Sequence, residues 1–181
     1  DFRNEAAGTG KRVQEIHIGI GLNSGPCCVG NMGSDQRFDY SVIGDTVNLA
    51  SRLEGQSKTY GVDIVIGPTT HEAAPAFATL ELDLIRVKGK NLPVRIHALM
   101  GDSGLKENAS FRELGARHQE MLAAYRSRNW TRARALLAEC RRFKFPLEIL
   151  YGLYAARIDA FIEEPPRQER ACARSRCRTR T

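Results

Sequence analysis

The sequence lacks any run of about 20 consecutive apolar residues, the length that a helix needs to cross a bilayer. Its polar start contains neither an initiator methionine nor the apolar stretch of a signal peptide. We therefore expect a fragment or a processed chain with a cytoplasmic location, and the cytosolic portion of a membrane-anchored parent remains an alternative. With 181 residues, 42% of them hydrophobic, the chain is long enough to build a packed core.

Cysteine and histidine are few and irregularly spaced. The five cysteines form no C-x-x-C pair, so the sequence predicts neither a zinc site nor a disulfide framework, and reduced cytosolic thiols fit best. We expect Cys27 and Cys28 to be small packing residues on an extended strand. The histidines suggest no hydrolase, and we expect each to be structural or at the surface, with the last of them on a helix surface: His17, His71, His97 and His118.

An excess of positive charge is confined to the C-terminus. Residues 165–181 hold six arginines and one glutamate, which account for +5 of the formal net charge of +6. The rest of the chain is therefore nearly neutral, and we do not expect a nucleic-acid partner. A polar segment rich in arginine predicts a basic disordered tail, with polyanion binding as the second interpretation.

The first hundred residues alternate between strand and short helix patterns. Apolar residues at period two, or runs of β-branched and aromatic residues, predict six strands, over residues 16–22, 27–30, 38–43, 62–66, 80–87 and 92–99. The last two strands flank a turn at Gly89 and predict an antiparallel hairpin. We therefore expect an α+β fold with helices on one side of the sheet, in preference to a doubly wound parallel fold.

Two helices are expected among these strands, and three more follow them. The first runs from about Thr46 to Glu54, with Asp45 or Thr46 as its cap and Gly55 as its end, and Pro68 opens a second. Residues 111–125, 130–143 and 147–161 are rich in Ala, Leu and Arg with apolar residues three and four apart. They resemble a tetratricopeptide-type unit, which must stack on something else to bury its apolar face.

Asn48 and Arg52 are the most informative pair in the sequence. Four residues of helix turn through about 400° and rise about 6 Å, so both side chains project from one face and can grip one ligand. Taken alone, such a pair is usually a solvated surface feature, and its surroundings decide between these interpretations.

The run VIGDTVNLASRLE, from Val42 to Glu54, closely resembles the signature of class III adenylate and guanylate cyclase catalytic domains. The strand and turn from Ile18 to Pro26 and the segment from Val29 to Gly33 are similar to the same family, in the same order. The resemblance covers about residues 14–101. It implies a partial ferredoxin-like cyclase domain with an antiparallel-rich sheet.

The domain organisation that follows has five parts. We expect a linker, the C-terminal part of a cyclase catalytic domain, a second linker, a tetratricopeptide-like helical extension and the basic tail, over residues 1–13, 14–101, 102–109, 110–164 and 165–181. The helical extension would offer a surface to a protein partner.

The resemblance also implies roles for four residues. Arg52 would stabilise the phosphate that is transferred, and Asn48 would orient the ribose. Ser41 stands where the family reads the purine; its hydroxyl favours adenine over guanine, although it could simply bond within its own sheet. Lys88, beside the turn glycine, matches a position that contacts the terminal phosphates, although such a lysine is often only solvent-facing.

The resemblance implies a metal and a partner as well. Family members bind two Mg²⁺ or Mn²⁺ ions through aspartates in a segment that has no counterpart upstream of Ile16, and we interpret Asp45 as a helix cap, not a ligand. The Asn/Arg pair of one domain meets the metal site of a second cyclase domain. We expect an adenylate cyclase that uses ATP in a homodimeric parent, with this chain inactive alone; the alternatives are a silent interaction module and a guanylate cyclase.

Overall fold

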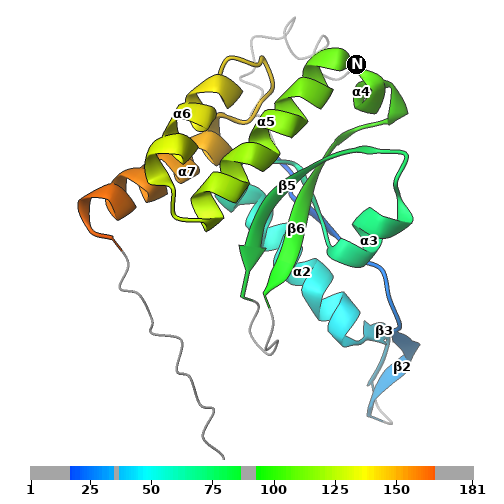
Figure 1. Ribbon diagram of the computed structural model, residues 1–181. Helices are drawn as coiled ribbons and strands as arrows, with labels where there is room; N and C mark the ends of the chain where they lie inside the picture. Colours follow the sequence, from blue (N-terminus) through cyan, green and yellow to red (C-terminus); the bar gives the residue numbers. More distant parts are fainter. Residues whose placement is uncertain (1–16, 35–36, 87–92, 166–181) are drawn as a thin grey trace, which may run out of the picture.

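A mixed four-stranded sheet forms the centre of the structure (Figure 1). This computed structural model describes residues 17–34, 37–86 and 93–165. The strands are β1 (Ile20–Leu22), β2 (Cys28–Ser34), β3 (Arg37–Ile43), β4 (Ile64–Ile66), β5 (Ala78–Ile85) and β6 (Val94–Gly101). The helices are α2 (Asp45–Tyr60), α3 (Pro68–Ala73), α4 (Ser103–Glu107), α5 (Ala109–Arg126), α6 (Trp130–Cys140) and α7 (Glu148–Glu163).

The pairing of the strands confirms the expected fold class. The sheet has the order β1-β4-β6-β5, in which only the β1–β4 pair is parallel, while β2 and β3 form a separate antiparallel hairpin. The fold is therefore α+β with an antiparallel-rich sheet. The predicted turn at Gly89 and most of the two predicted terminal segments lie outside the described residues. Among the residues that are described, no helix is long and apolar enough to span a membrane.

The first strand is packed directly beneath α2. A Cβ atom on Gly21 would lie 2.1 Å from the carbonyl oxygen of Ala50 and 2.3 Å from the amide nitrogen of Glu54, so only glycine allows this approach. The apolar residues that alternate with the glycines point the other way, and Ile18, the most exposed, has 69% of its surface accessible. The period-two pattern therefore corresponds to a strand with one face covered by α2 and the other face exposed.

Helix α2 is longer than predicted, and the expectation that Gly55 ends it is wrong. Buried side chains recur along its whole length, at Leu49, Leu53, Ser57 and Tyr60, so packing continues past the glycine. The helix ends at Gly61, whose positive φ of 66° closes the last turn. Its N-cap is Gly44 and no side chain caps it, which also corrects the expected capping role of Asp45 or Thr46.

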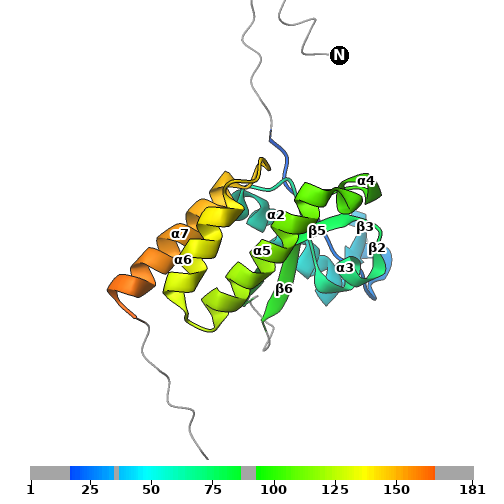
Figure 2. The same cartoon turned by 45° about the horizontal axis from the view of Figure 1, so that its top comes forward.

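The three C-terminal helices share one hydrophobic core with the sheet and α2. Leu53, Leu82 and Ile96 belong to the same buried cluster as Met121 of α5 and Ile158 of α7. Figures 1 and 2 both show α5 beside β5 and β6 with α6 on its other side, and α7 lies along α6 and reaches β5 through Tyr154. The segment predicted as a linker at 102–109 contains the short helix α4, which Asp102 caps through Leu105 N–H.

Side chains from these helices bond to the outer edge of β5. The Nε2 of His118 lies 2.6 Å from the carbonyl oxygen of Glu81, and the hydroxyl of Tyr154 donates to the carbonyl of Leu82 across 2.7 Å. A shift of register between Glu81 and Asp83 places these successive carbonyls along the strand edge. His118 is fully buried, so its expected place on a helix surface is wrong.

Candidate functional site

The candidate site is carried by the first half of α2. Asn48 and Arg52 are both exposed, whereas Leu49 and Leu53, each one residue further on, are 4% and 0% exposed. With 3.6 residues per turn, the side chains of Asn48 and Arg52 point in directions about 40° apart around the helix axis. Both point away from the buried face that Leu49 and Leu53 form. The structure therefore brings the two predicted residues together on the solvent side of one helix.

Two side-chain hydrogen bonds fix the start of this helix. Asn23, directly after β1, donates through Nδ2 to the carbonyl of Thr46 across 3.1 Å, and the Thr46 hydroxyl donates to the carbonyl of Pro26 across 3.1 Å. Within the described chain, Asn23 Oδ1 is buried and accepts no hydrogen bond. Sequence reasoning proposed Thr46 as a cap and predicted neither of these two hydrogen bonds, although both residues lie in the motifs that carry the resemblance.

Ser41 lies on β3, the strand that leads into α2. It is half-buried on β3 opposite Gly30 of β2, three residues before the N-cap of α2. Its neighbours Tyr40 and Val42 are 76% and 44% exposed. Figure 1 places this hairpin beyond the N-terminal end of α2, away from the C-terminal helices. Ser41 thus leads into the turn that presents Asn48, while Lys88 lies outside the described residues.

The hairpin does not bury the residues at its base. Cys27 and Cys28 are exposed, so the expectation that they are packing residues is wrong; the strand pair stands apart from the four-stranded sheet. Val29 and Ile43 are likewise more than half exposed. The uncovered apolar surface of the hairpin therefore adjoins the candidate site.

The described residues do not assemble a metal centre. In residues 17–34, 37–86 and 93–165 no three His, Cys, Asp or Glu side chains are grouped so as to hold an ion. Asp45 lies in the first turn of α2, where a carboxylate interacts favourably with the helix dipole. The described part of the chain therefore does not supply the ligand set that the family's chemistry calls for.

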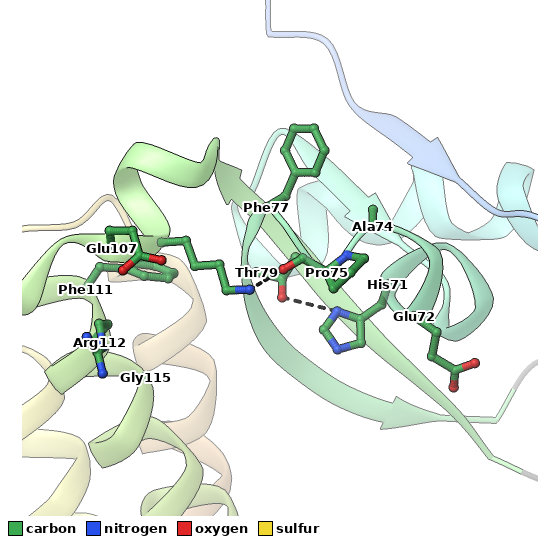
Figure 3. Close-up of a pocket in the computed structure, with 11 residues that line it drawn as sticks. His71, Glu72, Ala74, Pro75, Phe77, Thr79, Glu107, Phe111, Arg112 and Gly115 are labelled. Carbon is green, nitrogen blue, oxygen red and sulfur yellow. Dashed lines mark hydrogen bonds between the residues drawn. The ribbon is translucent and has the colours of Figure 1, made fainter.

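A cavity of about 630 Å³ lies elsewhere, between α3, β5, α4 and α5 (Figure 3). The hydroxyl of Thr79 and the Nδ1 of His71 are 3.2 Å apart inside it, and Lys106 donates to the carbonyl of Pro75 at its side. His71 stacks on His97 with ring centroids 3.9 Å apart. Burial, with the charge of His71 as a second cause, lowers the pKa of His97 to about 4. Of the predicted site residues that the structure describes, Ser41, Asn48 and Arg52, none lines this cavity.

Comparison with known proteins gives one consistent picture. The family profile described as Adenylate and Guanylate cyclase catalytic domain matches residues 3–101. The chain is 38% identical over 94 residues to an adenylate cyclase of Anabaena cylindrica, covering 49% of this chain and 19% of that protein. It is 31% identical over 103 residues to adenylate cyclase 1 of Rhizobium meliloti (strain 1021), covering 55% and 16%.

A solved structure is similar over about half of the chain. The adenylyl cyclase CyaB from P. aeruginosa is 34% identical, with a TM-score of 0.45, over 54% of this chain and 48% of that one. The chain spans only 19% and 16% of the length of the two relatives named above.

Proposed function

The chain belongs to the adenylate and guanylate cyclase catalytic domain family, and we propose that it forms one wall of an adenylate cyclase site shared by two cyclase domains. The reaction would convert ATP to cyclic AMP and pyrophosphate, as a lyase of intracellular signalling in the cytoplasm. The observation that carries the proposal is the exposed pair Asn48 and Arg52, one turn apart on a helix held against the core.

Arg52 is suited to the charge that develops in this reaction. The ribose O3′ bonds to the α-phosphorus as the bond from that phosphorus to the pyrophosphate oxygen breaks, so negative charge builds on phosphoryl oxygens. A guanidinium donates several hydrogen bonds to such oxygens and keeps its charge at every working pH. Asn48, on the same face, would hold the ribose so that O3′ is aligned with the phosphorus.

Ser41 and Lys88 would complete this wall. The Ser41 hydroxyl can accept a hydrogen bond from the exocyclic amine of adenine, which favours ATP, but it can also donate, so guanylate cyclase activity is the nearest alternative. Lys88 would contact the terminal phosphates. The names of the two adenylate cyclases that resemble this chain support the choice of adenine.

The second wall would come from another cyclase domain. Mg²⁺ or Mn²⁺ supplies charge neutralisation at the phosphates in this family, but the described residues do not fit a metal centre, so no step of the proposal passes through an ion held by them. The exposed apolar residues of the hairpin, such as Val29, Val42 and Ile43, support a protein contact beside Asn48. A homodimer in the parent protein is the arrangement that we propose.

A complementation assay tests the proposal. The 181-residue chain is mixed with a cyclase domain that keeps its metal-binding aspartates but has its own Asn/Arg pair replaced by alanine, and cyclic AMP is measured with ATP and Mg²⁺. We expect product from the mixture and none from either component alone. A mixture that binds tightly but forms no product would instead establish the silent interaction module, and product from this chain alone would contradict a shared site.

A further inference from the structure

One carboxylate joins three elements at the end of α2 opposite the hairpin. The Oδ2 of Asp83, on β5, accepts a hydrogen bond from the hydroxyl of Tyr60 across 2.9 Å and another from Nη1 of Arg157 across 2.6 Å. Its Oδ1 accepts from the amide of Leu84 across 2.7 Å. Asp83 therefore links the last residue of α2 to the C-terminal helix α7.

These groups are shielded from water. The Tyr60 residue is 1% exposed, and the side chains of Asp83 and Arg157 are 15% and 32% exposed. Burial, followed by the charge of Asp83, raises the pKa of Tyr60 to about 12. Burial alone disfavours the charged form of Arg157, but its hydrogen bond to Asp83 and the charge of that group outweigh this effect and raise the pKa of Arg157. The contact is therefore a partly buried ion pair with a neutral tyrosine hydrogen-bonded to it.

Helix α7 contacts the end of α2 at a second point. A Cβ atom on Gly61, the C-cap of α2, would lie 2.5 Å from the Cβ of Ile149 near the start of α7. The two contacts, through Ile149 and through Arg157, are eight residues apart on α7, which corresponds to about 12 Å along its axis. On α2 the two contacts fall on consecutive residues, Tyr60 and Gly61, so they fix the position of this end of the helix; together with the contact of β1 at Ala50 and Glu54 they set its direction.

The direction of α2 matters for Asn48 and Arg52. Arg52 precedes Tyr60 by eight residues, about 12 Å along the axis of the same continuous helix. A small tilt at Tyr60 is therefore carried to Arg52. Because a misplacement of about 1 Å can cost up to about a hundredfold in rate, such a tilt would affect the reaction.

We propose that Asp83 is a positioning residue. By accepting hydrogen bonds from Tyr60 and Arg157 on one oxygen, it ties α7 to the end of α2, so that the C-terminal helices set the orientation of Asn48 and Arg52. The inference rests on the proposed function. It deepens that function by making α7 a working part of the catalytic unit instead of an appended module.

The test uses two buried tyrosines whose hydroxyls each donate a hydrogen bond to β5. Tyr60→Phe removes the bond to Asp83 and leaves the ion pair with Arg157 intact. Tyr154→Phe, the matched control, removes the bond to Leu82 on the same strand and leaves the bond between Tyr60 and Asp83 in place. Both should lower Tm by a similar few degrees. In the complementation assay, Tyr60→Phe should lower kcat roughly tenfold with little change in KM for ATP, and Tyr154→Phe should leave kcat within about twofold.

Equal effects of the two variants on kcat would overturn the inference, because a purely stabilising bond would behave alike in both places. Arg52→Ala in the same assay separates failure of this inference from failure of the proposed function. Cyclic AMP formation that survives Arg52→Ala would contradict the proposed function itself.

Hydrogen exchange in the chain alone gives a second readout that needs no activity. Tyr60→Phe should speed amide exchange along α2 as far as Val47 to Leu53, whereas Tyr154→Phe should not. Faster exchange confined to the last turn, next to Tyr60, would show that the bond does not act at a distance and would overturn the inference.

Discussion

The Nε2 of His118 on α5 donates to the main-chain carbonyl of Glu81 on β5 across 2.6 Å, and its Nδ1 lies 3.3 Å from the hydroxyl of Tyr151. A carbonyl can only accept, so the proton sits on Nε2 and Nδ1 accepts from the tyrosine. Burial is the main cause that lowers the pKa of His118 to about 4. The neutral imidazole is therefore part of the fold.

This burial predicts a loss of stability in mild acid. The unfolded chain protonates His118 near pH 6.5 and the folded chain only near pH 4, so the free energy of unfolding falls as pH drops through this window. Between pH 7.5 and pH 5 the loss from His118 should be about 2 kcal/mol. Urea denaturation of the unsubstituted chain and of His118→Gln at both pH values measures this loss. Identical dependence of the free energy of unfolding on pH in the two proteins would refute the role of His118. His97 should give the variant a residual slope.

Two glycines should respond in opposite directions. Gly21→Ala places a Cβ atom 2.1 Å from the carbonyl oxygen of Ala50, so β1 and α2 must separate. We expect a loss of about 2–3 kcal/mol. Gly55→Ala has no atom within 4 Å of the new Cβ and lies inside α2, so it should stabilise the chain by about 1 kcal/mol. Thermal unfolding of both variants checks this, and equal Tm values would mean that α2 does not rest on β1.

The base preference should sharpen when Ser41 can only accept hydrogen bonds. Ser41→Asp replaces a hydroxyl by a carboxylate, which suits the amine of adenine and repels the carbonyl oxygen of guanine. We expect the ratio of kcat/KM for ATP over GTP to rise by roughly tenfold in the complementation assay. Ser110→Asp, an exposed serine on α5, is the control for added charge. An unchanged ratio for Ser41→Asp would remove Ser41 from the purine site.

Local patterns in the sequence predicted most elements but not all of their ends. The alternation around Ile20 and the spacing of apolar residues in α5 to α7 are properties of neighbouring residues, and they identify strands and helices directly. Gly55 misled the prediction, because its weak preference to end a helix loses to the burial of Ser57 and Tyr60 beyond it. The pairing of β2 with β3 as a separate hairpin was likewise not predicted.

The contacts between distant segments could not be predicted. Asp83 is 23 residues from Tyr60 and 74 from Arg157, and no local pattern marks the three as one cluster. His118 looked like a surface residue because its burial depends on the edge of β5. By contrast, the shared direction of Asn48 and Arg52 follows from helix geometry alone. Their catalytic roles, and those of Ser41 and Lys88, remain predictions.

The most direct test of the account is the rate of cyclic AMP formation by Arg52→Ala in the complementation assay. Loss of the guanidinium should remove about 3–4 kcal/mol of transition-state stabilisation, a fall of several hundredfold in kcat. Lys58 is an exposed cation further along the same helix, and Lys58→Ala should retain the rate of the unsubstituted chain. Equal rates for Arg52→Ala and Lys58→Ala would contradict the claim that this face of α2 meets the nucleotide.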